Sequence, residues 1–533
     1  MAKQSESTID LSPAEELLRK LLLDCRDHIV YNSHDSTNLD IWFTGGWVRD
    51  KLLGGESQDI DVALSSMTGA QFGEALEDHF ARSAAEYIVE AQRLGVPPTI
   101  KGLHKINSNP EKSKHLETGT IEIFGLSVDL VNLRKEVYTD QSRNPQVKFG
   151  TAVEDAYRRD ATINSIFYNL KRRQIEDHTQ MGLSDLAVGI IRTPLQPTQT
   201  FTDDPLRILR LIRFASRLGF QIDQETAQAM KDPLVQTAFN VKITRERVGI
   251  EVEKMMKGPD PLTAFEFLYE SNLYSTVFLD PPGYLGQALL HAFPRGERDI
   301  PWPNSWPIAF RNLAFLLQHK SGHSKRDFWE SETREHIWLM AVWAPLASLR
   351  RTDVEKVVKN ATGAIKTTSK TSKILGDCLK NMDSVHASVR QVATASAGVS
   401  RSALGMTVRS WGRSWKLQVL YVLLADAISQ AVDDGAFANL LDGYSKFMDH
   451  VFDQGLQNAS LAKPILNGSE LKTIFNLMQS GAFIKVALDG LVQWQFDHEH
   501  ASKTDATEWV LTQRENFHIP FPPKPTESPV TIL

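Results

Sequence analysis

Two aspartates one residue apart are the strongest sign of chemistry in this chain of 533 residues. Asp59 and Asp61 lie in the run QDIDVAL, whose apolar positions predict a β-strand. Side chains at positions i and i+2 of a strand point to one face, so the two carboxylates can share cations. Carboxylates that act together with substrate phosphates are typical ligands of Mg²⁺. Acidic pairs also occur in turns and strand edges, and glycosyltransferases use similar pairs, so this run alone leaves several chemistries open.

A glycine turn before the acidic strand offers a place for phosphate. Gly45 and Gly46 end an apolar run, and a short helix is predicted over residues 47–53. Backbone N–H groups at the start of a helix favour anions. Arg49, in the first turn, can add a charge-assisted hydrogen bond. Phosphate donors and metal-binding carboxylates are therefore expected from one compact unit.

A third carboxylate would complete a site for two metal ions. Asp129, in the run LSVDLVNLR, is the best candidate because it lies in another predicted strand. In two-metal catalysis one ion activates the attacking oxygen and the other stabilises the leaving group. These parts predict in-line attack on a nucleotide phosphate, although Asp129 can also be read as an exposed strand residue.

The run DAYRRDATIN supplies polar groups for a nucleotide sugar. Asp160 and Asn164 are four residues apart, on one face of a helical turn. They can bind ribose hydroxyls while one of the two arginines, Arg158 or Arg159, binds phosphate. Arg-Arg-Asp on its own is also typical of a surface ion-pair cluster.

The run TDDPLRILRLIRFASRLGF predicts a helix with Asp204 as its N-cap and Pro205 as its first residue. Arg207 follows one turn later, and Arg210 continues a basic stripe. The apolar positions expected in the core are Leu206, Leu209, Ile212 and Ala215. A cap with an ion pair to Arg207 is one interpretation of this start.

Base recognition is the other interpretation of Asp204 and Arg207. Cytosine and adenine each present an amine donor beside a ring-nitrogen acceptor, whereas guanine and uracil reverse this pair. A carboxylate and a guanidinium can therefore bind C or A and reject G and U. A mismatched base would leave buried polar groups unpaired, at about 1–3 kcal/mol each.

The elements that must position these residues change in type along the chain. Short strand-like runs alternate with helical segments up to about residue 192, which predicts an α+β domain with a small mixed sheet. After a Pro- and Thr-rich connector, the pattern predicts helices separated by Pro and Gly breaks. We expect a catalytic head over residues 1–192, a helical neck with base recognition over 193–270, and a helical body and tail over 271–533.

Composition is that of a folded protein, with 42% hydrophobic and 23% charged residues. Two cysteines are too few for a disulfide framework. The net charge of -6 argues against uniform coating with nucleic acid, but residues 158–257 and 350–373 carry local basic excesses. Both segments fit either a phosphate-facing surface or a solvated helix face. We expect a soluble intracellular protein with no membrane segment.

The order of these motifs resembles the class II tRNA nucleotidyltransferases, the CCA-adding enzymes of the DNA polymerase beta superfamily. The resemblance covers roughly residues 40–257 and is carried by GGWVRDKLLGGESQDIDVAL, GTIEIFGLSVDLVNLR, RRDATINSIFYNL, DDPLRILRLIRFASRLGF and ITRERVGIEVEKMM. The segments HLETGTIEIFG and SRNPQVKFGTAVEDAYRRDATIN are similar to eukaryotic members, with a fungal source as the expectation.

The resemblance implies addition of C, C and A to the 3′ end of tRNA from CTP and ATP, with two Mg²⁺ ions and release of pyrophosphate. It implies metal binding by Asp59 and Asp61, with Asp129 as the third carboxylate. The resemblance also points to a set of nucleotide-binding residues, some in the family's motifs and some next to them. They are Gly45, Gly46, Arg49, Arg158, Asp160, Asn164, Asp203, Asp204, Arg207 and Arg210. Asp203 stands where bacterial members often have Glu, and residues 138–155 are similar to the family's flexible loop.

The expected partners are the tRNA 3′ end and acceptor arm, CTP and ATP, and we expect a monomer. Cytoplasm and nucleus are the expected locations, with the mitochondrion reached through an alternative start. A poly(A) polymerase, an enzyme that adds only CC or only A, and a catalytically inactive RNA-binding scaffold remain the alternatives.

Overall fold

The computed structural model describes residues 9–32, 39–106, 118–139, 142–279, 283–292, 304–318, 328–329, 331–394, 399–430 and 434–521. The chain divides into two compact units, Met1–Val277 and Phe278–Leu533. The expected boundary near residue 193 lies inside the first unit, so the division into head, neck and body stays a prediction. The Pro-rich end of the chain from residue 522 and the stretch 107–117 lie outside the described residues.

A mixed sheet of seven strands forms the centre of the first unit, in the order β3-β4-β5-β2-β1-β8-β9. Its strands are β1 Ile41–Thr44, β2 Asp59–Leu64, β3 Ile100–Ile106, β4 Thr118–Ile123, β5 Leu126–Asn132, β8 Ile166–Asn169 and β9 Gln174–Asp177. β2 pairs with β5 in parallel and with β1 antiparallel. β2 and β5 therefore lie in the interior of the sheet, and the α+β head predicted from the sequence is confirmed.

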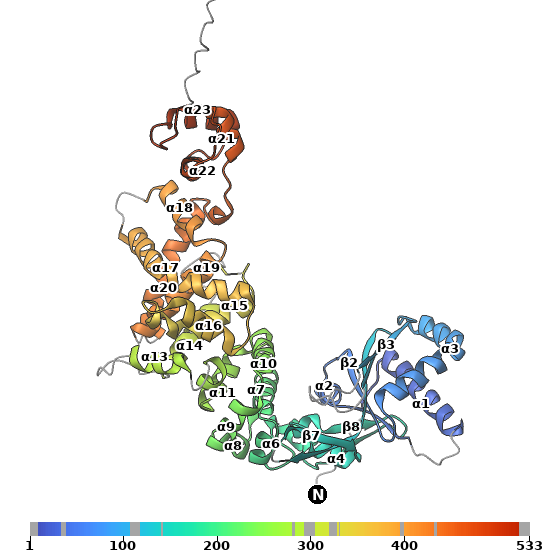
Figure 1. Ribbon diagram of the computed structural model, residues 1–533. Helices are drawn as coiled ribbons and strands as arrows, with labels where there is room; N and C mark the ends of the chain where they lie inside the picture. The colour runs from blue at the N-terminus through green and yellow to red at the C-terminus, as the bar shows by residue number, and fades with distance from the viewer. Residues whose placement is uncertain are drawn as a thin grey trace, which may run out of the picture. The chain divides into compact units, whose positions relative to one another are not determined.

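Helices cover this sheet and extend the first unit (Figure 1). α3 packs against α1 and against β3, β4 and β5, while α2 contacts β1, β2 and β8. The helices are α1 Pro13–Asn32, α2 Gly46–Leu52, α3 Gly69–Leu94, α4 Ala152–Tyr157, η2 Thr162–Asn164, α5 Gly182–Val188, α6 Pro197–Asp203, α7 Leu206–Leu218, α8 Gln224–Met230, α9 Pro233–Lys242, α10 Arg245–Lys257, α11 Pro261–Glu270 and α12 Tyr274–Phe278, the last of which ends in the second unit. Two strand pairs lie outside the sheet: β6 Arg134–Thr139 with β7 Ser142–Phe149, and β10 Ile190–Ile191 with β11 Gln221–Ile222.

Local sequence signals explain where the important helices begin and end. Thr68 and Gln71 form a capping box at the start of α3, so the free N–H groups of its first turn are satisfied. α7 buries the predicted apolar positions and ends at Gly219, whose φ of 68° suits glycine. The helix begins at Leu206 with Pro205 as its N-cap, so the expectation that Asp204 is the N-cap and Pro205 the first helical residue was wrong by one position, although Oδ1 of Asp204 still accepts the N–H of Leu206 at 3.2 Å. The short strand β11 is the exception to a helical chain after residue 193.

Helices make up the second unit in its described part, which agrees with the prediction. They are α13 Tyr284–Ala292, α14 Trp306–Gln318, α15 Arg334–Trp343, η3 Ala344–Leu349, α16 Val354–Ala364, α17 Ser369–Thr394, α18 Arg401–Trp411, α19 Trp415–Ser429, α20 Asp434–Asp453, η4 Ala459–Leu461, α21 Gly468–Phe475, α22 Ala482–Asp497 and α23 Lys503–Thr512. α19 is buried along most of its length and contacts α14, α15, α17 and α20. Among the helices of the described ranges, none is long and apolar enough to cross a membrane.

Gly69 allows α3 to approach the sheet, and this contact predicts a stability effect. A Cβ atom at Gly69 would lie 1.8 Å from the carbonyl oxygen of Leu130, which is backbone and cannot rotate away. Gly69→Ala should therefore destabilise the first unit by about 1–3 kcal/mol, as overpacking does, measured as a lower midpoint of urea unfolding. Gly102→Ala is the control, since nothing lies within 4 Å of its added Cβ. Equal midpoints for the two variants would contradict the close approach.

Candidate active site

Three aspartates meet at the centre of the sheet. Asp61 of β2 lies opposite Asp129 of the parallel strand β5, so the two side chains share a face, and Asp59 lies two residues before Asp61. Thr44, the last residue of β1, is the antiparallel partner of Asp61. The structure therefore brings Asp59, Asp61 and Asp129 together beside the end of β1.

Gly45 touches this carboxylate group directly. Its φ of 72° favours glycine, and a Cβ atom there would lie 2.8 Å from Oδ2 of Asp61. The same Cβ would be 3.3 Å from Nη1 of Arg159. The glycine that begins the turn into α2 is therefore required both by its backbone conformation and by the Asp61 side chain.

Asp61 lies in an environment that disfavours its charge. Burial raises its pKa above the ordinary value, and the carboxylates of Asp129 and Asp59 raise it further. Arg159 and Arg210 oppose these effects. Crowded carboxylates of this kind attract a cation, and perturbed pKa values are common at functional sites.

A chain of buried polar contacts connects the glycine turn to α7. Nη1 of Arg49 donates to Oδ1 of Asn164 at 2.6 Å, and Nδ2 of Asn164 donates to Oδ1 of Asp160 at 3.2 Å. Arg210 of α7 donates to the other oxygen of Asp160 at 2.6 Å. Burial alone would raise the pKa of Asp160, but Arg210, Asn164 and Arg207 hold it well below its ordinary value. Four of the predicted nucleotide-binding residues thus form one network.

Arg158 takes a different position from its neighbour Arg159. It donates to Oδ1 of Asp155 at 2.8 Å and pairs with Glu136 of β6 at 3.4 Å. Burial lowers the pKa of Arg158 to about 10, against the opposing effect of Asp155. Arg159, which the sequence interpretation did not single out, is the arginine beside Asp61 and Gly45. Arg158 caps the C-terminus of α4 in helical backbone conformation, and both arginines pair with Asp155, so no local pattern in the sequence distinguished Arg159 from Arg158.

The start of α7 holds the residues predicted to recognise the base. Asp204 accepts the N–H of Leu206 at 3.2 Å and pairs with Arg247 of α10 at 3.3 Å. Arg207 is buried and pairs with Glu136 at 3.4 Å. Asp203 ends α6, accepts a hydrogen bond from Gln199 at 2.8 Å, and has a pKa raised by burial. Glu136, which contacts both Arg158 and Arg207, had no distinguishing signal in the sequence.

The three aspartates fit a magnesium site in which substrate phosphates supply the remaining ligands. Within the described residues, no group of three His, Cys, Asp or Glu side chains could hold a metal ion. Mg²⁺ does not require such a cage, because one or two carboxylates plus substrate phosphates and waters suffice. Asp59 and Asp61 on one strand face, with the charge of Asp129 acting on Asp61, provide that donor set.

Comparison with protein families agrees with this arrangement. Residues 41–192 match the poly A polymerase head domain, and residues 219–284 match the probable RNA and SrmB-binding site of polymerase A. The fold and the acidic strand thus define a nucleotidyltransferase of the poly A polymerase head type.

Relatives that match over nearly the whole chain identify the family more closely. The chain is 35% identical to the mitochondrial CCA tRNA nucleotidyltransferase of Saccharomyces cerevisiae, over 92% of this chain and 91% of that protein. It is 32% identical to the tRNA nucleotidyltransferase cca2 of Schizosaccharomyces pombe, over 95% and 99%. It is 36% identical to the nucleotidyltransferase lcsQ of Purpureocillium lilacinum, over 96% and 94%. The chain belongs to the CCA tRNA nucleotidyltransferase family.

Solved structures show the same fold at lower identity. A CCA-adding enzyme in its apo form II matches with a TM-score of 0.60 and 19% identity, over 94% of this chain and 96% of that chain. The Thermotoga maritima CCA-adding enzyme complexed with tRNA matches with a TM-score of 0.57 and 20% identity, over 93% and 94%. The expected family fold is confirmed.

The raised pKa of Asp61 predicts a variant that is more stable but inactive. The folded protein binds the Asp61 proton more tightly than the unfolded chain does, so the contribution of this group to stability is lost as pH rises through the folded-state pKa. Asp61→Asn should therefore increase the free energy of unfolding at pH 7 in EDTA, with a smaller increase at pH 4, and should abolish nucleotide transfer.

Asp155→Asn provides the contrast with opposite sign. Arg159 and Arg158 outweigh the effect of burial and lower the pKa of Asp155, so its stabilising contribution is present at neutral pH and is lost in acid. This variant should be destabilised at pH 7, and less so in acid. Urea unfolding at both pH values measures the two effects, and a loss of stability at pH 7 in Asp61→Asn would contradict the interpretation of its environment.

Proposed function

We propose that the protein adds C, C and A in sequence to the 3′ end of tRNA, using CTP and ATP and releasing pyrophosphate. The observation that carries the proposal is the meeting of Asp61, Asp129 and Gly45 at the centre of the sheet, beside the end of β1, in a chain of the CCA tRNA nucleotidyltransferase family. Such a site can hold a nucleotide triphosphate beside a metal-binding carboxylate group.

Nucleotidyl transfer requires the 3′-hydroxyl of the tRNA to attack the α-phosphorus while pyrophosphate departs. Asp59 and Asp61 would hold Mg²⁺, and Asp129 would complete the carboxylate group. When bound, Mg²⁺ lowers the pKa of the attacking hydroxyl and neutralises the charge on the leaving phosphates. Arg159, held by Asp155 and the carbonyl of Asn164, keeps a fixed positive charge beside Asp61.

The turn into α2 and the following network would bind the rest of the nucleotide. Gly45 and Gly46 leave the backbone open to the triphosphate, and the guanidinium of Arg49 lies 3.3 Å from the Cβ that would be added at Gly46. Asp160 and Asn164 offer oxygen and amide groups to the ribose, as the sequence suggests. Arg158 would act on phosphate only after exchanging its present contacts with Asp155 and Glu136.

Asp204 and Arg207 would select the base, with Asp203 and Arg210 beside them. Both selecting residues are engaged elsewhere, Asp204 with Arg247 and Arg207 with Glu136. The contacts are 3.3 and 3.4 Å long, at the weak end for charged hydrogen bonds, so a cytosine or adenine edge can replace them.

Location and assembly are part of the same proposal. Relatives in two yeasts carry the word mitochondrial in their names. We therefore place this protein in the mitochondrion as well as in the cytoplasm and nucleus, acting as a monomer on the acceptor arm of tRNA. The name of the Purpureocillium relative states only nucleotidyl transfer, which makes the identity of the product the property to measure.

The product test separates full CCA addition from its alternatives. Purified protein is given tRNA transcripts that end before the first C, the second C or the A, with CTP, ATP or both, and the product ends are sequenced. We expect CCA in every case with both nucleotides present, and no transfer in EDTA. Long A tails would indicate a poly(A) polymerase, a stop at CC or addition of A alone would indicate a partial enzyme, and no extension would indicate a scaffold.

Base selection predicts a specific loss in one variant. Arg207→Ala removes the donor to the ring nitrogen of C or A, so the ratio of kcat/KM for CTP over UTP should fall by about 10- to 100-fold, the equivalent of one or two buried hydrogen bonds. Arg217→Ala is the control, because this exposed arginine of the same helix pairs with Asp50. Unchanged discrimination in Arg207→Ala would refute the base-selecting role.

A further inference from the structure

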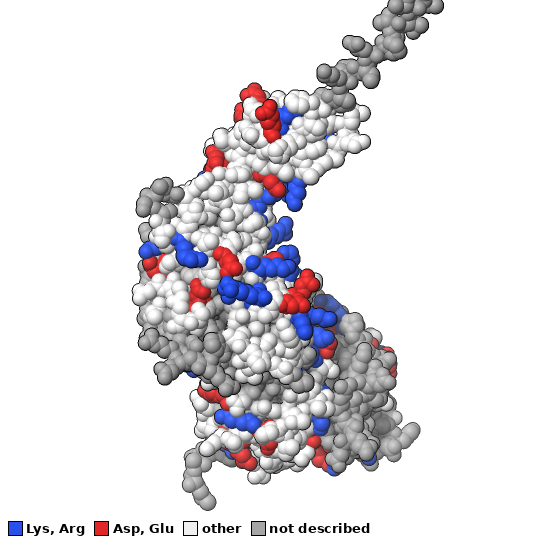
Figure 2. Space-filling model, turned by 60° about the vertical axis from the view of Figure 1, so that its left-hand side comes forward, with Lys and Arg blue, Asp and Glu red and all other residues white. Residues whose placement is uncertain are grey.

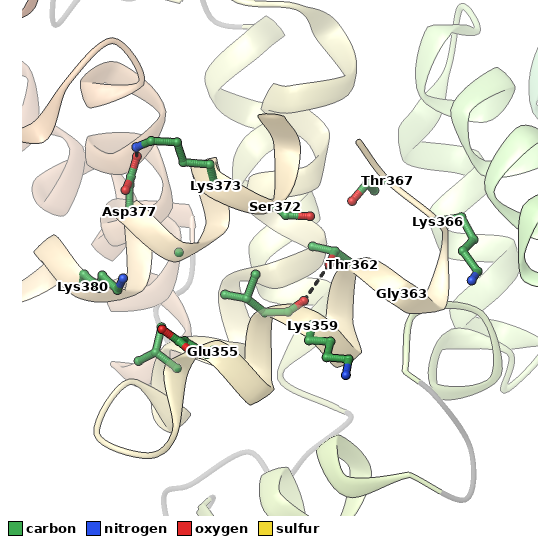
Figure 3. Close-up of a pocket in the computed structure, with 13 residues that line it drawn as sticks. Glu355, Lys359, Thr362, Gly363, Lys366, Thr367, Ser372, Lys373, Asp377 and Lys380 are labelled. Carbon is green, nitrogen blue, oxygen red and sulfur yellow. Dashed lines mark hydrogen bonds and ion pairs between the residues drawn. The ribbon is translucent and has the colours of Figure 1, made fainter. Parts of the chain in front are cut away.

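Ion pairs on the surface of this protein differ from one that is buried beside the glycine turn. Figure 2 shows basic and acidic side chains intermixed on the surface. In the groove between α16 and α17, Lys373 pairs with Asp377 at 2.5 Å, although the lysine side chain is 75% exposed (Figure 3). Pairs of this kind contribute little to stability, because water screens both charges.

Glu15 of α1 and Lys51 of α2 form the buried pair. Their side chains are 3% and 11% exposed, and Nζ of Lys51 lies 2.8 Å from Oε2 of Glu15. Moving two charges out of water costs free energy, so a buried pair is weak evidence for a role in stability alone. α1 precedes residues 41–192, which match the poly A polymerase head domain. The pair therefore connects the helix after the glycine turn to a segment outside the matched domain.

Three donors hold the carboxylate of Glu15. Besides Lys51, the backbone N–H of Ser12 donates to Oε2 at 2.7 Å, and Nε1 of Trp47 donates to Oε1 at 2.9 Å. Trp47 is itself buried and packs edge-on against Phe43 of β1, with 4.8 Å between the ring centroids. Because both of its oxygens are engaged, the Glu15 side chain is fixed relative to α2.

These contacts act on the face of α2 that lies opposite Arg49. Trp47 and Lys51 are four residues apart and share one face of the helix, whereas Arg49 is two residues from each, about 200° around the helix axis. On its own face, Arg49 donates to Oδ1 of Asn164 at 2.6 Å. α2 is therefore held from two sides, by Glu15 and by Asn164.

A helix as short as α2 depends on such external contacts. It has seven residues, and its N-cap Gly45 makes no side-chain hydrogen bond. Helices of this length are not stable by themselves, because forming the first turn fixes several residues for a single hydrogen bond. The direction of α2, and with it the location of Arg49, thus depends on side chains from other elements.

We propose that Glu15 is a positioning residue for the triphosphate of CTP and ATP. It acts through Trp47 and Lys51, which set the orientation of α2 and therefore of the Arg49 guanidinium. The inference rests on the proposed function, in which the glycine turn and Arg49 meet the triphosphate. Because other residues bind the base and the ribose in that function, loss of Glu15 weakens the contacts to the β- and γ-phosphates alone.

The affinities for CTP and CMP test this role. In Glu15→Gln the amide oxygen can still accept from Trp47, but Lys51 loses its carboxylate. The Kd for CTP should rise about tenfold, as for the loss of one hydrogen bond between charged groups, while the Kd for CMP, which has no β- or γ-phosphate, stays unchanged. Calorimetric titration of the full-length protein with Mg²⁺ and without tRNA measures both values. Partial unfolding would raise both Kd values by one factor and leave their ratio unchanged.

Variants of the same helices control for charge and folding. Glu16→Gln removes the neighbouring carboxylate of α1, which pairs with Arg19 and Arg173 rather than with α2, and should keep the wild-type ratio. Glu15→Gln/Lys51→Met removes both charges, so no buried lysine is left unpaired. Its unfolding midpoint should recover toward the wild-type value, while the ratio of the two affinities stays low because the ion pair to α1 is still missing. This double variant is measured instead if Glu15→Gln does not fold.

Steady-state kinetics provide a second readout. In Glu15→Gln the KM for CTP and the KM for ATP should rise by the same factor, because both nucleotides carry the same triphosphate. The KM for tRNA and the preference for CTP over UTP should not change. A loss of base discrimination in this variant would contradict a role confined to the triphosphate.

The possible failures are distinguishable. A Kd for CMP that rises as much as the Kd for CTP would show that Glu15 supports only the fold, and would overturn the inference. An unchanged ratio of affinities in the variant, with wild-type protein that still adds CCA, would also overturn it and leave the proposed function standing. Absence of nucleotide addition by wild-type protein would overturn the proposed function instead.

Discussion

The ion pair between the buried Asp160 and the partly exposed Arg210 fixes the relation between the catalytic sheet and the helix that follows it. Asp160 comes just before η2 and Arg210 lies in the middle of α7, at a contact of 2.6 Å. Removing Arg210 would leave the buried carboxylate of Asp160 without its strongest partner, which would destabilise the folded protein. Asn164 extends the contact to Arg49 of α2. The glycine turn, η2 and α7 are therefore joined by one network of polar contacts.

Aspartates a short distance apart in this site experience opposite environments. Asp155 and Asp160 have their charge satisfied by arginines, and their pKa values are low. Asp61 is buried near two other carboxylates, and its pKa is high. The first two hold the scaffold in place with or without a ligand. In the proposed function, a cation bound beside Asp61 would offset the free energy that its charge costs the folded protein, so a local cost to stability would mark the site.

The sequence was sufficient where a local pattern determines structure. Alternating apolar residues around Asp59 and Asp61 predicted β2, and the periodicity after Asp204 predicted α7 with its buried face. Contacts between distant segments were not predictable, because several arginines could reach each carboxylate. Arg159 rather than Arg158 lies beside Asp61, and Glu136 pairs with Arg207 from a strand about 70 residues earlier. The roles of these residues in nucleotide binding stay predictions, since the described contacts are those of the protein alone.

The contact between Glu136 and Arg207 has a consequence for selectivity in the proposed function. Arg207 is buried, so a base that offers no acceptor would leave it unpaired if it had no other partner. Glu136 supplies that partner, and Arg207 need not be unsatisfied when a wrong base enters. A correct base must therefore displace a carboxylate, which lowers the affinity for that base and reduces the penalty that an unpaired Arg207 would impose on a wrong one. Weak binding suits a template made of protein, because each nucleotide must be exchanged after every addition, and the choice of base then depends on the combined bonds to Asp204 and Arg207.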